Sequence, residues 1–198
     1  MAHATTDVVD EIARSLATTG AVVAGIGEDQ WVLGTPCEGW TVRTVLNHTV
    51  GGMRIFAAEL EGLPPGADHE ADWLGSDPRT AFAEAAHADA TAWRRPGALG
   101  GTVTLGMGTL PAPMAAVIHL TEVLVHGVDL AVATGQQHLL DEASCERLLA
   151  TMHAMGGVDA YRQPGMFGPE VAAPADARPH ERLLAFLGRT VSTAPATV

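Results

Sequence analysis

MAAVIHLTEVLVHGVDLAVAT, residues Met114–Thr134, is the stretch from which the rest of the chain is best interpreted. Apolar residues fill most of its positions and leave no polar face, which predicts one long helix buried among other helices. Four ionisable residues interrupt it: His119, Glu122, His126 and Asp129. At about 100° per residue, spacings of three and four place them within about 80° of one another, so we expect all four on one face.

Glu122 and His126 are the pair in this stretch that points to chemistry. They are four residues apart, about 6 Å along the helix axis, so their side-chain ends can meet at one atom. A carboxylate in apolar surroundings is either protonated or paired with a cation, and no Lys or Arg occurs between Arg95 and Arg147. Two interpretations remain open: a divalent metal held by imidazole nitrogen and carboxylate oxygen, or a Glu–His hydrogen bond that closes a polar seam. A third ligand would favour the metal.

His48, on a second predicted helix, is the candidate for that third ligand. Thr41 can cap this helix, which extends to about Glu61, and His48 falls on its apolar side. Gly51 and Gly52 each cost about 1 kcal/mol inside a helix, so we expect another backbone or a ligand to lie close to them. Alone, His48 would be interpreted as a core histidine, but beside an acid–histidine pair it becomes the expected third ligand.

The remaining sequence predicts a single all-α unit over residues 1–189. Periodicity and capping residues predict further helices near 7–24, 78–95, 141–156 and 179–189, with caps at Thr6 or Asp7, at Asp77 and at Asp141. Residues 62–76 read as a linker, and the Gly-rich stretch 99–110 as a short strand or extended crossover. Residues 163–179, which contain several Pro, form either an ordered covering loop or a mobile lid, and residues 190–198 a disordered tail.

The composition argues against several classes of partner. The 198 residues carry a net charge of −12, and the 11 basic residues are all Arg and scattered, whereas nucleic acids and anionic membranes require a concentrated basic surface. The N-terminus lacks a basic region followed by an apolar core, and no apolar run reaches about 18 residues without an ionisable group. Cys37 and Cys145 are far apart and outside any C-x-x-C pattern, which suits a reducing cytoplasm. We therefore expect a soluble, cytoplasmic protein.

Two motifs together resemble a known family. They are PCEGWTVRTVLNH at Pro36–His48 and HLTEVLVHGVDLA at His119–Ala131, with further similarity in DWLGSDPRTAF at Asp72–Phe82 and RLLAFLGR at Arg182–Arg189. They resemble the DinB-like superfamily of metal-binding four-helix bundles, and more narrowly the N-terminal domain of mycothiol-dependent maleylpyruvate isomerase. The resemblance implies a four-helix bundle, here with a short extended crossover and a C-terminal helical extension.

The resemblance also implies that His48, Glu122 and His126 bind a divalent metal, usually zinc, and leave one coordination position open. A small thiol such as mycothiol at that position would be deprotonated and could add to a small electrophile, as a transferase or a cis–trans isomerase does. Water there would instead support hydrolysis, and a third possibility is a non-enzymatic metal-binding protein of stress response or partner binding. Relatives commonly have Trp where this chain has Val128, and the full-length isomerase carries a C-terminal domain for which too few residues remain here.

Several other residues keep two interpretations. Asp129 either orients a ligand histidine through its second nitrogen, or makes an interhelical polar contact or belongs to the C-terminal turn. His119 is either a fourth ligand or a residue that hydrogen-bonds a ligand, or else a core hydrogen-bonding residue. Arg54 and Arg94 either hold an anionic substrate or are solvated surface residues. Cys37 is either reactive or simply buried. We expect a small thiol and a small electrophile as partners, and a monomer or a homodimer.

Overall fold

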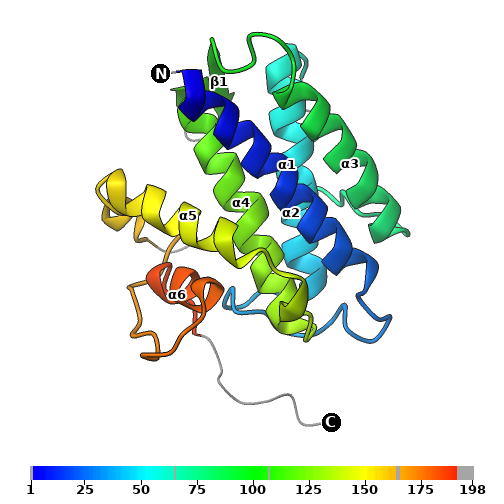
Figure 1. Cartoon of the computed structure of the whole chain (residues 1–198). Helices are drawn as coiled ribbons and strands as arrows, with labels where there is room; N and C mark the ends of the chain where they lie inside the picture. Colours follow the sequence, from blue (N-terminus) through cyan, green and yellow to red (C-terminus); the bar gives the residue numbers. More distant parts are fainter. Residues whose placement is uncertain (1, 65, 107, 164–165, 191–198) are drawn as a thin grey trace.

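The computed structural model describes residues 2–64, 66–106, 108–163 and 166–190, with side chains in the first helix described from residue 8 onward (Figure 1). The predicted all-α class is confirmed. The helices are α1 (Ala2–Ala24), α2 (Val42–Glu61), α3 (Pro78–Trp93), α4 (Ala112–Ala133), α5 (Glu142–Ala154) and α6 (Pro179–Phe186). Two short strands, β1 (Thr102–Leu105) and β2 (Gly108–Pro111), and two 3₁₀ turns, Gln137–Leu139 and Asp159–Tyr161, complete the described elements.

Helices α1 to α4 form the bundle, in which α1 and α4 run in one direction and α2 and α3 in the other (Figure 1). Contacts between the helix ends agree with this arrangement: Gln136, after α4, donates to the carbonyl of Val22 near the end of α1, and Arg95 pairs with Glu61 at the ends of α3 and α2. Since α3 runs parallel to α2, the chain must first return along the length of α2. Residues 62–77 make that return, which explains the long linker.

Helix α4 is the core helix of the bundle. Most of its residues are buried, and it packs mainly against α1 and α2. It is long and apolar enough to cross a membrane by composition, but its burial by other helices identifies it as the centre of a folded core. The approach of α1 is close: a Cβ on Gly127 would lie 2.2 Å from the Thr19 hydroxyl oxygen, so a larger residue at 127 would force the two helices apart.

The predicted helix boundaries are mostly confirmed. Thr41 Oγ1 accepts the Thr44 amide, Asp77 accepts the Thr80 amide, and Asp141 caps α5 in the same way. The predicted cap at Thr6 or Asp7 is wrong, because α1 already begins at Ala2. The 99–110 stretch contains both β1 and β2, which pair as an antiparallel hairpin with Thr102 opposite Pro111. Helix α3 ends at Trp93 and α6 at Phe186, a few residues before the predicted ends.

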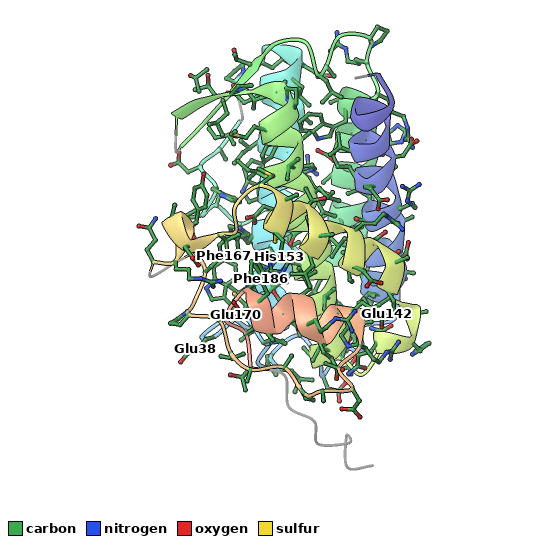
Figure 2. All side chains as sticks on the ribbon, turned by 60° about the vertical axis from the view of Figure 1, so that its left-hand side comes forward. Glu38, Glu142, His153, Phe167, Glu170 and Phe186 are labelled. Atoms are coloured by element: carbon green, nitrogen blue, oxygen red, sulfur yellow. The ribbon has the colours of Figure 1, made fainter. Side chains whose placement is uncertain are left out.

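Helices α5 and α6 form the predicted C-terminal extension and lie across the flank of α4 (Figure 1). Between them the His153 and Phe186 rings lie 4.6 Å apart, and Phe167 lies nearby (Figure 2). In the described part of the 163–179 stretch, Val171 donates its amide to the Ala185 carbonyl of α6, as a covering loop would. The predicted tail falls almost wholly on residues 191–198, outside the described residues.

Candidate metal centre

Helices α2 and α4 bring together the three side chains that the sequence nominates as ligands. Glu122 Oε2 lies 3.0 Å from His48 Nε2 and 3.4 Å from His126 Nε2. All three donor atoms lie within 4.8 Å of one another. His48 comes from the α2 face that packs on α4, whereas Glu122 and His126 are one helical turn apart on α4, so a single interhelical contact creates the cluster.

This donor set fits a zinc-like ion. Two imidazole nitrogens and one carboxylate oxygen are typical of catalytic zinc sites, which keep a fourth position open. Ligand atoms about 2.1 Å from a tetrahedral ion lie about 3.4 Å from each other, close to the separations between Glu122 and the two histidines. Both histidines also present the same nitrogen, Nε2, to the carboxylate. The cluster therefore has the composition and the spacing that such an ion needs.

Asp129 and Arg189 hold His126 in this orientation. His126 Nδ1 lies 3.0 Å from Asp129 Oδ2, so the ring donates its Nδ1 hydrogen to the carboxylate and turns Nε2 toward Glu122. Asp129 is fully buried, and the Arg189 Nε donates to both of its oxygens at 3.0 and 3.2 Å. Arg189 follows α6, so the C-terminal extension supplies the cation that balances a carboxylate inside the bundle. The structure thus places Asp129 where one of its two interpretations expected it.

Burial and hydrogen bonding set the charges of the cluster. Burial tends to raise the pKa of Glu122, but hydrogen bonds to His126 and His48 outweigh it and hold the pKa well below the usual range. Burial tends to lower the pKa of His126, yet the hydrogen bonds to Asp129 and Glu122 raise that pKa to about 9. Burial lowers the pKa of His48. At neutral pH the metal-free cluster therefore contains a Glu122 carboxylate, a His126 imidazolium and a neutral His48 imidazole.

Aromatic rings enclose the two histidines. The Trp40 ring stacks on His126 at 5.8 Å and meets His48 edge-on at 4.8 Å. On the other side of His48, the His69 ring stacks at 4.2 Å and its Nε2–H donates to the His48 carbonyl at 3.0 Å. These rings restrict the orientation of His48 and His126. The sequence reasoning gave neither Trp40 nor His69 a role here.

His69 and Trp73 also explain the glycines of α2, and they correct one expectation. A Cβ on Gly51 would lie 2.6 Å from Trp73 Nε1 and 2.9 Å from His69 Cδ2. The groups that come close are therefore side chains of the linker, rather than the expected backbone or ligand. Around Gly52 there is more room, since the nearest atom to such a Cβ is His69 Nε2 at 3.7 Å.

Other nominated residues lie elsewhere. His119 is buried and bonds Asp89 of α3 at 2.8 Å, which agrees with its interpretation as a core residue. Arg54 pairs with Glu84 on the α3 side of α2. Arg94 caps the end of α3, and its neighbour Arg95 pairs with Glu61, about 20 Å along α2 from His48. The structure does not bring His119, Arg54 or Arg94 to the cluster.

Cys37 borders the cluster but has the character of a buried thiol. Its sulfur lies within 4.8 Å of donor atoms of His126 and Asp129. Burial raises the pKa of the Cys37 thiol, and the nearby carboxylates raise it further against the opposing effect of Arg189. The thiol is therefore protonated at neutral pH, which argues against Cys37 as a nucleophile.

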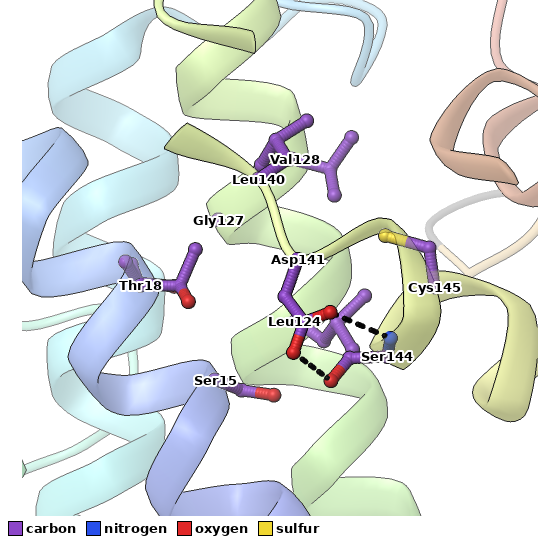
Figure 3. Close-up of a pocket in the computed structure, with 10 residues that line it drawn as sticks. Ser15, Thr18, Leu124, Gly127, Val128, Leu140, Asp141, Ser144 and Cys145 are labelled. Atoms are coloured by element: carbon purple, nitrogen blue, oxygen red, sulfur yellow. Dashed lines mark hydrogen bonds between the residues drawn. The ribbon is translucent and has the colours of Figure 1, made fainter. Parts of the chain in front are cut away.

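Of two cavities that adjoin α4 in the described part of the chain, one is lined by a residue of the cluster. The smaller one lies between α1, α4 and the start of α5 (Figure 3). Within it Ser144 donates to Asp141 at 2.9 Å, whereas the buried Ser15 hydroxyl has no hydrogen-bond partner among the described residues, and none of the three proposed ligands lines it. The larger one is lined by Glu122. A small molecule therefore reaches the cluster from the side of the larger cavity.

The fold agrees with comparisons against known proteins. Residues 12–131 match the family described as the mycothiol maleylpyruvate isomerase N-terminal domain. The chain belongs to this family. Two relatives from Mycobacterium tuberculosis, the uncharacterized proteins MT0763 of strain CDC 1551 and Rv0738 of strain H37Rv, are each 37% identical over 177 residues, which is 86% of this chain and 91% of theirs.

A solved structure also shares the fold. The crystal structure of a histidine-to-alanine variant of mycothiol-dependent maleylpyruvate isomerase aligns with a TM-score of 0.52 and 20% identity, over 64% of this chain and 60% of that one. The family match includes His48, Glu122, His126 and Asp129 but ends before α5. In this member of the isomerase N-terminal domain family, Arg189 and one wall of the larger cavity thus come from residues outside the matched region.

Proposed function

We propose that this protein binds a divalent metal through His48, Glu122 and His126, and that the donor set makes this metal zinc. We also propose that the bound metal activates a small thiol, mycothiol, which either is transferred to a small electrophile or adds to it and leaves again, so that the electrophile is isomerised. The observation that carries the proposal is the cluster of two histidines and one glutamate on facing helices, with His126 oriented by Asp129. Family membership supports mycothiol as the thiol. A net charge of −12 fits small-molecule partners in the cytoplasm better than nucleic acid.

Each residue of the centre has a definite task in this chemistry. When bound, the ion supplies Lewis acidity that lowers the pKa of a thiol so that it reacts as a thiolate at neutral pH. Asp129 fixes the tautomer of His126, and Arg189 compensates the buried charge of Asp129. Trp40 packs on both histidines and limits the access of water to them. Glu122, whose side chain is 36% exposed, is the most open of the three proposed ligands and marks where reactants enter.

Metal uptake is expected to release about one proton at neutral pH. Because the pKa of His126 is raised to about 9, its imidazolium must lose a proton before Nε2 can bind a metal, whereas Glu122 is already ionised. Zinc affinity should therefore rise about tenfold per pH unit from pH 7 toward 9 and level off above it. Calorimetry in buffers of different ionisation enthalpy measures the released proton. Asp129→Asn weakens the hydrogen bond that raises the pKa of His126, so this variant should release fewer protons when it binds zinc. Equal proton release by the variant and the wild type would contradict the assignment of the released proton to His126.

Thiol chemistry is tested with the cobalt-substituted protein. Addition of mycothiol is expected to produce a thiolate-to-cobalt charge-transfer band, and S-methyl mycothiol, which has the same sugars but no ionisable sulfur, is the matched control. A band with mycothiol alone supports the proposal. If cobalt binds but no thiol changes the spectrum, the thiol-dependent reaction is wrong, and ester or amide hydrolysis becomes the reaction to assay. If purified protein binds no metal, the enzymatic proposal is wrong as a whole.

A further inference from the structure

The larger cavity next to Glu122 is a groove between α4 and the C-terminal extension. One wall is a single face of α4, with residues at helical spacing: Met114, Val117, Ile118, Thr121 and Glu122. The opposite wall comes from the end of α5 and the turns that follow it: Met152, Met155, Val158, Tyr161 and Phe167. Among the described residues, Glu122 is the one that this groove shares with the candidate metal centre.

The walls of this groove are apolar and unusually exposed. Exposed hydrophobic side chains that gather in one place are a feature of binding sites, whereas single ones are common on any protein surface. Four exposed large hydrophobic side chains line this groove: Met114, Met155, Tyr161 and Met166. Methionine side chains adapt to ligands of different shape, which suits a pocket for an apolar small molecule better than a fixed polar site. The Tyr161 hydroxyl adds one hydrogen-bonding group at this surface.

The charge of the groove distinguishes between classes of ligand. Among its described lining residues, Glu122 alone is charged, and none is Arg or Lys. A carboxylate placed on the walls away from Glu122 would lose hydration without gaining a cationic partner, because none of these described residues is cationic. A cationic ligand would have to compete for Glu122 with His48 and His126, which already contact it. An uncharged ligand meets neither penalty.

We propose that this groove binds the electrophilic substrate, and that the substrate is an uncharged, largely apolar small molecule; the assignment to a substrate rests on the proposed function. Glu122 belongs both to the groove and to the candidate metal centre, so a molecule in the groove lies beside the place where the thiol would react. The residues of the α4 wall all lie inside the region that matches the family, but the residues of the opposite wall lie after residue 131. The extension of this chain therefore sets the substrate class.

Two fluorescent probes with the same ring skeleton test the ligand class. N-phenyl-1-naphthylamine is uncharged, and 8-anilinonaphthalene-1-sulfonate adds one sulfonate. The uncharged probe is expected to bind the zinc-loaded protein at least about tenfold more tightly. Met155→Glu should weaken its binding at least about fivefold, because it replaces an apolar contact by a charge, whereas Met155→Leu should stay within about twofold. Met155 is 56% exposed, so neither variant disturbs the core.

A control variant and a second measurement separate this inference from the proposed function. Val32→Glu changes another exposed apolar residue, 78% exposed and outside the groove, and should leave probe binding unchanged. Zinc affinity should be the same in all three variants, since neither position contacts the cluster. Equal binding of both probes, or weaker binding in Val32→Glu but not in Met155→Glu, would overturn the inference while zinc and thiol binding stand. Selective binding of the uncharged probe by protein without zinc affinity would overturn the proposed function alone.

A second copy of the chain is the competing occupant. If the groove were a dimer interface, sedimentation would show a dimer that Met155→Glu dissociates, and the uncharged probe would bind only to the dissociated protein. That result would overturn the inference. An unchanged sedimentation coefficient in wild type and Met155→Glu, together with the expected probe selectivity, supports the substrate groove.

Discussion

Replacing His126 with alanine is expected to lower zinc affinity by more than about 100-fold. His126 supplies one of the three proposed donors, and the loss of a residue that merely supports a metal ligand already costs about 10–100-fold. The removal of a donor itself should exceed that range. The affinity is measured by competition with a chromophoric chelator at a fixed pH above 9, where the protonation of His126 no longer contributes.

Two further variants keep this prediction informative. Glu122→Gln preserves the shape of a partly exposed side chain but removes the anionic donor, so it should also lose zinc even if His126→Ala proves unstable. His87→Ala removes an exposed histidine of α3 and should bind zinc like the wild type. Zinc affinity within about threefold of wild type in both ligand variants would show that the three side chains form only a hydrogen-bonded polar seam.

The composition of the cluster on α4 could be predicted because helical spacing is rigid. Three and four residue steps place Glu122, His126 and Asp129 on one face whatever surrounds the helix, and the structure brings these side chains together. His119 shares that face but lies two turns, about 10 Å, before His126. At that height the hydrogen-bond partner is Asp89 of α3, and the His119 ring also packs on Phe56 of α2. Angular position was predictable from sequence, whereas the partner side chain at each height was not.

The aromatic rings that enclose the two histidines were not predicted, because they come from segments without helical periodicity. Trp40 lies in the α1–α2 connection, and His69 lies in the long linker that returns along α2. Both contacts depend on how irregular segments fold over the bundle, which residue spacing does not specify. The only sequence signal for Trp40 was its position inside the Pro36–His48 motif. At Gly51, too, the sequence predicted that another group comes close to the helix, but it did not predict that this group is a side chain of the linker.

The contact between Arg189 and Asp129 also could not be predicted from residue spacing, because the two residues are far apart in the sequence. The absence of Lys and Arg between Arg95 and Arg147 indicated that a cationic partner for Glu122 must come from elsewhere in the fold. The structure instead places a cation from a distant segment on Asp129: Arg189, which lies 60 residues away at the end of the extension. In the sequence, Arg189 was singled out only by its place in the RLLAFLGR motif. Tertiary docking of α6 against the bundle is what turns that residue into part of the centre.

Replacing Arg189 with methionine is expected to destabilise the protein by about 3–5 kcal/mol. The variant keeps much of the apolar volume but removes the guanidinium from the fully buried Asp129 carboxylate and leaves His126 as its charged partner. Zinc affinity should also fall about 10–100-fold, because Asp129 without Arg189 is held less firmly and orients His126 less well. Denaturant unfolding of the metal-free protein measures the first effect, and chelator competition under native conditions measures the second.

The double variant Arg189→Met with Asp129→Asn separates charge compensation from orientation. It removes both buried charges but retains an oxygen that can accept the His126 Nδ1 hydrogen. Stability should recover by at least about 2 kcal/mol relative to Arg189→Met alone, since no unpaired charge remains buried. Zinc affinity should stay below wild type, because a neutral amide supports the imidazole less strongly than a carboxylate. If Arg189→Met alone kept both wild-type stability and wild-type zinc affinity, the extension would have no part in building the centre, and its role would be confined to the wall of the groove.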